Sequence, residues 1–236
     1  MDGKSWRIEQ SVATLVDPAW GGGAATIDLA NPSRGLVGVP GVSGAVLGIQ
    51  AASASATELR LADAYVRGAD LVARFTPSTN FPFGTEVYWR VGRRPEPPTI
   101  ELIASVQTDL LDTHPKLMTR SVVGSSSVSP IVEQDGVIDA ASELDQDMPK
   151  AVGCLAGAGP VWVEFAHPSD RREALLEAAR HPGDTVSIGW RLFSAFLEKG
   201  VIRRARITAA LLSSADPTTV GALYRRFATQ APPLTA

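Results

Sequence analysis

The chain has 236 residues, of which 44% are hydrophobic and 20% charged, and its formal net charge is −3 at pH 7. This length and apolar content are sufficient to bury a large core, which excludes a disordered chain. The small negative charge provides no basic surface for a phosphate backbone, so we expect no nucleic-acid partner. The 21 glycines and 17 prolines favour frequent turns over long helices.

Cysteine usage and hydropathy bear on the cellular location. Cys154 is the only cysteine, which excludes an internal disulfide framework and a multi-cysteine zinc site and favours a cytoplasmic protein. The polar start of the chain does not match a secretory signal. The most apolar stretch, 36–51, is shorter than the roughly 18 to 20 residues that cross a bilayer, so we expect no membrane segment.

Short stretches of alternating apolar and polar residues, bounded by Gly, Pro, Asn or Asp, recur along the chain. They predict a mainly β, antiparallel protein. In chain order, the predicted strands are 6–16, 25–29, 44–49, 57–66, 70–76, 85–91, 100–110, 116–123, 161–166, 185–193 and 201–213.

Three of these strands recur in the same order, which predicts an internal duplication. The similar segments are 70–78 with 160–169, 86–91 with 187–192, and 100–106 with 205–211. We expect residues 1–236 to form one compact unit of two β halves, about 1–123 and 150–236, joined by a mobile, polar and acidic crossover at 124–149. The halves form either two sandwiches side by side or, as the lack of a flexible linker favours, one merged two-layer sandwich. Chance similarity between strands is the alternative.

Two short helices are predicted at the edge of the sandwich. Asp216 is a suitable N-cap and Pro217 suits the first helical position. The apolar residues that follow recur at helical spacing, at Val220, Leu223, Tyr224 and Phe227, which predicts a helix that docks by one face. A second helix is predicted over 170–180, where Asp170 and Glu173 have the spacing of a capping box.

The usual catalytic and cofactor motifs are absent from the sequence. It contains no Gly-x-Ser-x-Gly elbow, no phosphate-binding loop and no dinucleotide fingerprint, so we expect no cofactor. The three histidines, His114, His167 and His181, each precede a proline and have no metal-ligand spacing. The acidic crossover does not fit an EF-hand, because the sixth position from Asp135 is alanine rather than glycine. We therefore expect no metal site.

The pairs Trp89-Arg90 and Trp190-Arg191 occupy equivalent places in the predicted duplication. Adjacent residues on a strand point to opposite faces, so a tryptophan in the core directs its arginine outward. Guanidinium groups on such a face can bind a sugar or a carboxylate. The predicted ligand-binding residues are Arg90, Arg191, Trp162, Tyr88 and Arg74, with Trp162 as an exposed aromatic platform. The alternative is that the tryptophans only fill the core and the arginines are solvated.

These features leave three functional hypotheses, and whether the protein is an enzyme stays open. The first is a non-catalytic β-sandwich module that binds a small polar ligand such as a sugar. The second is a carbohydrate-active enzyme in which His167 and Glu164 supply general acid/base catalysis. The third is a subunit of a homo-oligomer or larger assembly, in which tryptophan and arginine side chains are interface anchors.

Overall fold

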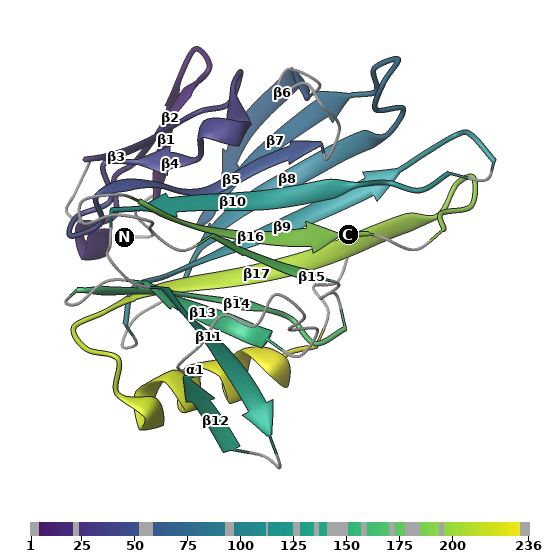
Figure 1. The fold of residues 1–236 in the computed structure, drawn as a ribbon. Helices are drawn as coiled ribbons and strands as arrows, with labels where there is room; N and C mark the ends of the chain where they lie inside the picture. The colour runs from purple at the N-terminus through teal and green to yellow at the C-terminus, as the bar shows by residue number, and fades with distance from the viewer. Residues whose placement is uncertain are drawn as a thin grey trace.

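A computed structural model describes residues 5–20, 24–51, 59–92, 97–111, 113–124, 128–134, 137–140, 151–156, 160–169, 173–177, 185–193 and 196–231. These residues form two antiparallel sheets packed face to face and one α-helix (Figure 1). The predicted fold class, a mainly β antiparallel sandwich, is confirmed.

The first sheet has eight strands. In spatial order they are β1 (Trp6–Glu9), β2 (Val12–Leu15), β3 (Ala25–Asp28), β4 (Leu36–Val37), β5 (Gly44–Ala51), β10 (Leu117–Val123), β16 (Val186–Leu192) and β15 (Glu173–Glu177). Two short 3-10 helices, η1 (Pro18–Trp20) and η2 (Pro32–Arg34), lie in the connections between its first strands.

The second sheet has nine strands. In spatial order they are β12 (Val137–Ala140), β11 (Val128–Gln134), β13 (Ala151–Ala156), β14 (Val161–Ala166), β17 (Ile202–Leu212), β9 (Thr99–Gln107), β8 (Gly84–Val91), β7 (Asp70–Thr76) and β6 (Arg60–Arg67). Strands β6 to β9 are consecutive in the chain and form a meander, which β17 joins to the rest of the sheet.

The main core lies between the inner faces of the two sheets. Trp89 of β8, Trp162 of β14 and Trp190 of β16 are each at most 1% exposed within it. The strict alternation of buried and half-buried residues in β8 shows why Trp89 points inward while its neighbours point outward. Complete burial of a large apolar side chain stabilises the fold by about 1.5–3 kcal/mol, so each of these tryptophans contributes strongly to the stability.

The predicted C-terminal helix is confirmed as α1 (Pro217–Ala228), and the Asp216 side chain caps it by accepting a hydrogen bond from the Thr219 backbone N–H at 2.8 Å. Its apolar face packs on the outer face of the nine-stranded sheet, against Val161, Val163 and Phe165 of β14. Strand β14 is therefore covered on both faces. No helix among the described residues is long and apolar enough to span a membrane.

The second predicted helix, over 170–180, is wrong where the structure describes it. Residues Glu173–Glu177 form edge strand β15, which pairs with β16. Ala174 and Leu176 pack against the main core from this strand. Pairing with β16 and contact with the core override the local helical signal. Residues 170–172 and 178–180 lie outside the described residues.

The segment 124–149 was expected as a mobile polar crossover, but it contains strands β11 and β12. Ile131 of β11 is fully buried beneath α1, so its apolar contacts outweigh the acidic composition around it. Residues 141–149 lie outside the described residues. Among the segments aligned in the duplication, β9 pairs with β17, whereas β8 and β16 lie in different sheets. The duplication stays a prediction.

Candidate functional site

A row of directly paired residues crosses seven strands on the outer face of the nine-stranded sheet. From β6 to β13 its members are Arg67, Asp70, Arg90, Glu101, Thr208, Phe165 and Gly153. We call this set the cross-strand row. It changes from charged residues at the β6 end to apolar residues at the β13 end, where Phe165 packs against Tyr224 of α1 with ring centroids 5.6 Å apart.

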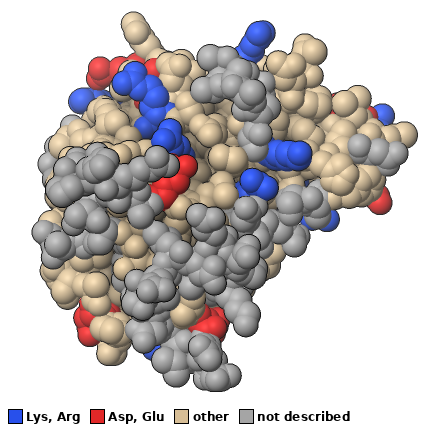
Figure 2. Space-filling model, viewed as in Figure 1, with Lys and Arg blue, Asp and Glu red and all other residues tan. Residues whose placement is uncertain are grey.

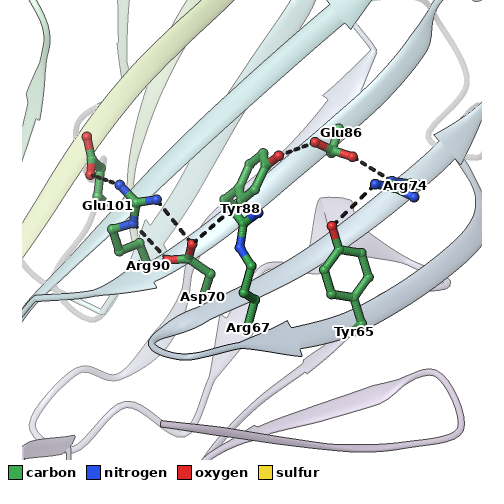
Figure 3. Close-up of polar contacts among 8 residues, drawn as sticks. All are labelled: Tyr65, Arg67, Asp70, Arg74, Glu86, Tyr88, Arg90 and Glu101. Carbon is green, nitrogen blue, oxygen red and sulfur yellow. Dashed lines mark hydrogen bonds and ion pairs between the residues drawn. The ribbon is translucent and has the colours of Figure 1, made fainter. Parts of the chain in front are cut away.

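The charged end of the row is connected by ion pairs. The Arg90 Nε donates to Asp70 Oδ1 at 2.7 Å, and Nη2 donates to Oδ2 at 3.1 Å (Figure 3). Arg90 Nη1 also lies 3.9 Å from Glu101 Oε2. The hydrogen bonds from Arg90 to Asp70 raise the pKa of the Arg90 guanidinium. A bidentate pair of this kind fixes both side chains in position.

Arg67 is held less firmly at the edge of the sheet. Its Nη2 lies 3.6 Å from Asp70 Oδ2, and the arginine side chain is 58% exposed. The guanidinium also lies over the Tyr88 ring, 5.8 Å from the ring centroid. Exposed ion pairs of this length contribute little to stability, so Arg67 can reorient at low cost.

A second group of polar contacts lies further along the same face. Arg74 Nε donates to Glu86 Oε2 at 2.6 Å, and Arg74 Nη2 donates to the Tyr65 hydroxyl at 3.3 Å. The Tyr88 hydroxyl donates to Glu86 (Figure 3). Burial and this hydrogen bond raise the pKa of Tyr88 to about 12. Burial alone would raise the pKa of Glu86, but the hydrogen bonds from Tyr88 and Arg74 hold it below its ordinary value.

A pocket of about 650 Å³ lies between the cross-strand row and α1. This volume is in the range that accommodates small molecules in proteins. One wall is polar and is formed by Arg67, Asp70, Arg90, Thr99, Glu101 and Thr208. The other wall is apolar and is formed by Phe165, Ala210, Leu223 and Phe227. Arg226 and Gln230, in and just after α1, also line the pocket, as do Gly68, Ala69, Val91 and Gly92.

The structure separates the predicted ligand-binding residues into different places. Arg90 lines the pocket, whereas Tyr88 and Arg74 lie on the same outer face in the second polar group, outside the lining. Arg191 lies on β16, in the other sheet. Trp89 and Trp190 are both fully buried, so both arginines project outward as expected. They project from opposite sheets, however, and the prediction that they share one face is wrong.

The prediction that Trp162 is an exposed platform is also wrong. Trp162 is 1% exposed, and its ring packs edge-on against Trp20 with centroids 6.4 Å apart. Its Nε1 donates to Glu164 Oε1 at 2.8 Å. The other sheet covers one face of β14 and α1 covers the other, so neither face of this strand presents an aromatic ring to solvent.

Glu164 and His167 do not form the predicted acid/base pair. Glu164 is fully buried between the sheets, where it accepts hydrogen bonds from the Ser121 hydroxyl, Trp162 Nε1 and, at 3.2 Å, Trp190 Nε1. His167 lies on the outer side, where its ring meets Phe227 edge-on at 5.3 Å. The two side chains thus lie on opposite faces of the sheet, and neither lines the pocket.

The Glu164 contacts extend into the eight-stranded sheet. Ser121 of β10 donates to Glu164 and accepts from the Leu47 backbone N–H at 2.8 Å. Trp89 Nε1 donates to the Leu47 carbonyl oxygen at 3.2 Å. Leu47 has φ 53° where the register between β5 and β10 shifts, so this bulge turns its backbone groups toward the interior. One polar network therefore links the two sheets.

The buried carboxylate predicts a specific pH dependence of stability. Burial raises the pKa of Glu164 above the ordinary value of 4.5, against the hydrogen bonds from its three donors. The folded protein then binds more protons at this site than the unfolded chain, so the stability contribution is fully present below pH 4.5 and decreases as the pH rises toward the folded-state pKa. Urea unfolding from acidic to neutral pH will show wild type losing stability relative to Glu164→Gln. A constant difference would contradict this assignment.

No single charge dominates the described residues on the face drawn in Figure 2. The Lys and Arg side chains there lie in separate small groups, and Asp and Glu side chains lie both at the margins and beside Lys or Arg side chains within the face. Within the described residues, no group of three or more His, Cys, Asp and Glu side chains is placed to hold a metal ion.

Comparison with known proteins finds similarity of fold but none of sequence family. No family model and no curated protein sequence matches it. Among solved structures, it is similar to the Slr1438 protein of Synechocystis sp. PCC 6803, with 9% identity, a TM-score of 0.49, and coverage of 89% of this chain and 95% of that one. It is also similar to a candidate aldose 1-epimerase of Klebsiella pneumoniae subsp. pneumoniae MGH 78578, with 11% identity, a TM-score of 0.47, and coverage of 92% and 80%. The neighbours thus include a sugar-related enzyme, but these scores carry no argument about function.

Proposed function

We propose that this β-sandwich binds a small polar ligand of monosaccharide size in the pocket between the cross-strand row and α1. The observation that carries the proposal is the contrast between the two walls of the pocket. A sugar ring presents hydroxyl groups at its edge and C–H groups on its faces, so it needs polar and apolar surfaces at once. The pocket supplies both within about 650 Å³.

The polar wall has the donors and acceptors that hydroxyl groups require. Asp70 and Glu101 supply carboxylate oxygens, Arg90 supplies guanidinium N–H groups, and Thr208 supplies a hydroxyl that both donates and accepts. Arg90 and Asp70 already hold each other in a bidentate pair. Side chains that are ordered before binding lose less conformational entropy when a ligand arrives, which favours affinity.

The pocket supports binding rather than the catalytic hypothesis. The residues predicted for general acid/base chemistry, His167 and Glu164, are both buried away from the lining. Glu164 is also occupied by three hydrogen-bond donors from the core. We therefore propose a binding module and assign no reaction to it.

A bulky substitution at Thr208 tests the proposal. Thr208→Trp places a large ring in the pocket, so isothermal titration calorimetry against a panel of neutral and acidic monosaccharides will show binding to wild type and none to the variant. Thr76→Trp is the matched control. Thr76 is exposed, lies at the end of β7 opposite to Asp70 and does not line the pocket. Thr208→Val, which removes only the hydroxyl, will weaken binding about tenfold.

Two results would contradict the proposed function. One is that wild type binds no member of the panel at millimolar concentration. The other is that Thr208→Trp, with a melting temperature close to that of wild type, still binds as tightly as Thr76→Trp does. If Thr208→Trp does not fold, Thr208→Val decides the question, since it keeps the branched shape of the side chain and removes only the hydrogen-bonding hydroxyl.

A further inference from the structure

The charged side chains of the pocket are held to different degrees. In its described lining they are three arginines, Arg67, Arg90 and Arg226, and two carboxylates, Asp70 and Glu101. Arg90 hydrogen-bonds to both Asp70 oxygens and lies 3.9 Å from Glu101, whereas Arg67 is exposed at the edge of the pocket. An exposed guanidinium beside a pocket attracts an anion.

The geometry identifies Arg67 as the group best placed to meet that anion. Both carboxylate oxygens of Asp70 accept hydrogen bonds from Arg90, at 2.7 and 3.1 Å. Arg67 reaches Asp70 only at 3.6 Å and has a side chain that is 58% exposed. Arg67 can therefore turn toward a ligand without breaking the Arg90–Asp70 pair. Its planar fork of N–H donors matches a carboxylate in geometry.

We propose, on the basis of the proposed function, that the ligand is a sugar acid with one carboxylate, of the hexuronate class. Its carboxylate pairs with Arg67 at the edge of the pocket, and its hydroxyls meet Asp70, Glu101 and Thr208. Asp70 and Glu101 repel a phosphate dianion more strongly than a single carboxylate, so the charges favour a carboxylate over a phosphate.

Calorimetry with three probes tests the charge of the ligand. Wild type will bind glucuronate about tenfold or more tightly than glucose, because charge-assisted hydrogen bonds contribute about 1.5–3 kcal/mol. Glucose 6-phosphate will bind more weakly than glucuronate. The preference for glucuronate over glucose will decrease at high salt, since salt screens the exposed Arg67.

Three variants on β6 assign the effect to Arg67. Arg67→Ala will bind glucuronate no better than glucose. Arg67→Lys will recover part of the preference, because it keeps the positive charge but loses the planar, bidentate N–H donors of the guanidinium. Arg60→Ala is the matched control, since Arg60 is also an exposed arginine of β6 but lies outside the pocket lining. It will keep the wild-type preference.

The outcomes separate this inference from the proposed function. Equal binding of glucose and glucuronate, abolished by Thr208→Trp, would overturn the sugar-acid inference and leave the binding function intact. Tighter binding of glucose 6-phosphate would overturn the choice of a carboxylate, and equal losses in Arg67→Ala and Arg60→Ala would overturn the role of Arg67. No binding of any probe would contradict the proposed function itself.

Discussion

Replacing Glu164 with alanine will lower the free energy of unfolding by about 3–5 kcal/mol. The substitution leaves Trp162 Nε1, Trp190 Nε1 and the Ser121 hydroxyl without their acceptor in a fully buried space. Each buried polar group that loses its partner costs about 1–3 kcal/mol, and the cavity adds to that cost. Removal of a buried carboxylate offsets part of the loss, which keeps the expected total below the sum of these effects. Urea unfolding at neutral pH measures the difference.

Two further variants show whether the network is the cause. Glu164→Gln keeps one acceptor oxygen and will lose less stability than Glu164→Ala. Ser121→Ala removes a single donor to Glu164 and also the acceptor for the Leu47 N–H, so we expect a loss of about 1–3 kcal/mol. A Glu164→Ala protein within about 1 kcal/mol of wild type would show that the network contributes little.

Replacing Phe227 with alanine will destabilise the protein by about 3–5 kcal/mol and will also weaken ligand binding. Phe227 is 3% exposed and lies in the cluster that attaches α1 to β14 and β17. Its ring meets His167 at 5.3 Å and lies 5.7 Å from the Arg206 guanidinium. It also forms part of the apolar wall of the pocket, so the same substitution changes stability and binding together.

Thermal unfolding and calorimetry of Phe227→Ala measure the two effects. Arg225→Ala is the control, because Arg225 is exposed on the same helix and does not line the pocket, and we expect its stability to stay within about 0.5 kcal/mol of wild type. If Phe227→Ala lost stability while its ligand affinity stayed at the wild-type level, α1 would not form a wall of the binding site.

Local sequence signals predicted several elements well because those elements depend on neighbouring residues. Asp216 and Pro217 mark the start of α1, and the spacing of its apolar residues marks the face that docks. Alternation within β8 likewise placed Trp89 inside and Arg90 outside. Strand β15 shows the limit, since only its pairing with β16 makes that segment extended.

The candidate site was only partly predictable, because it depends on strand register. Asp70, Arg90 and Glu101 lie on three consecutive strands with matching outward orientation, and that pattern is readable in the sequence. Their alignment in one row with Thr208, more than 100 residues later in the chain, requires the pairing of β9 with β17. A sequence pattern specifies the face of a side chain but not its cross-strand partner.

Trp162 illustrates a different limit. Its position two residues from Glu164 correctly placed both side chains on one face of β14. Which face is solvent-exposed depends on the layers above and below the strand. Here the second sheet covers the face of Trp162, and α1 covers the opposite face, so the exposed platform expected from the sequence does not exist.

The most direct test of the binding site is a two-dimensional amide NMR titration of the full chain with glucuronate. If the ligand binds between the cross-strand row and α1, the signals that shift will be those of Arg67, Arg90, Glu101, Thr208 and Phe227, with those around Arg191 on the other sheet unchanged. Shifts centred on Arg191, or saturable binding with no change at the cross-strand row, would contradict the account.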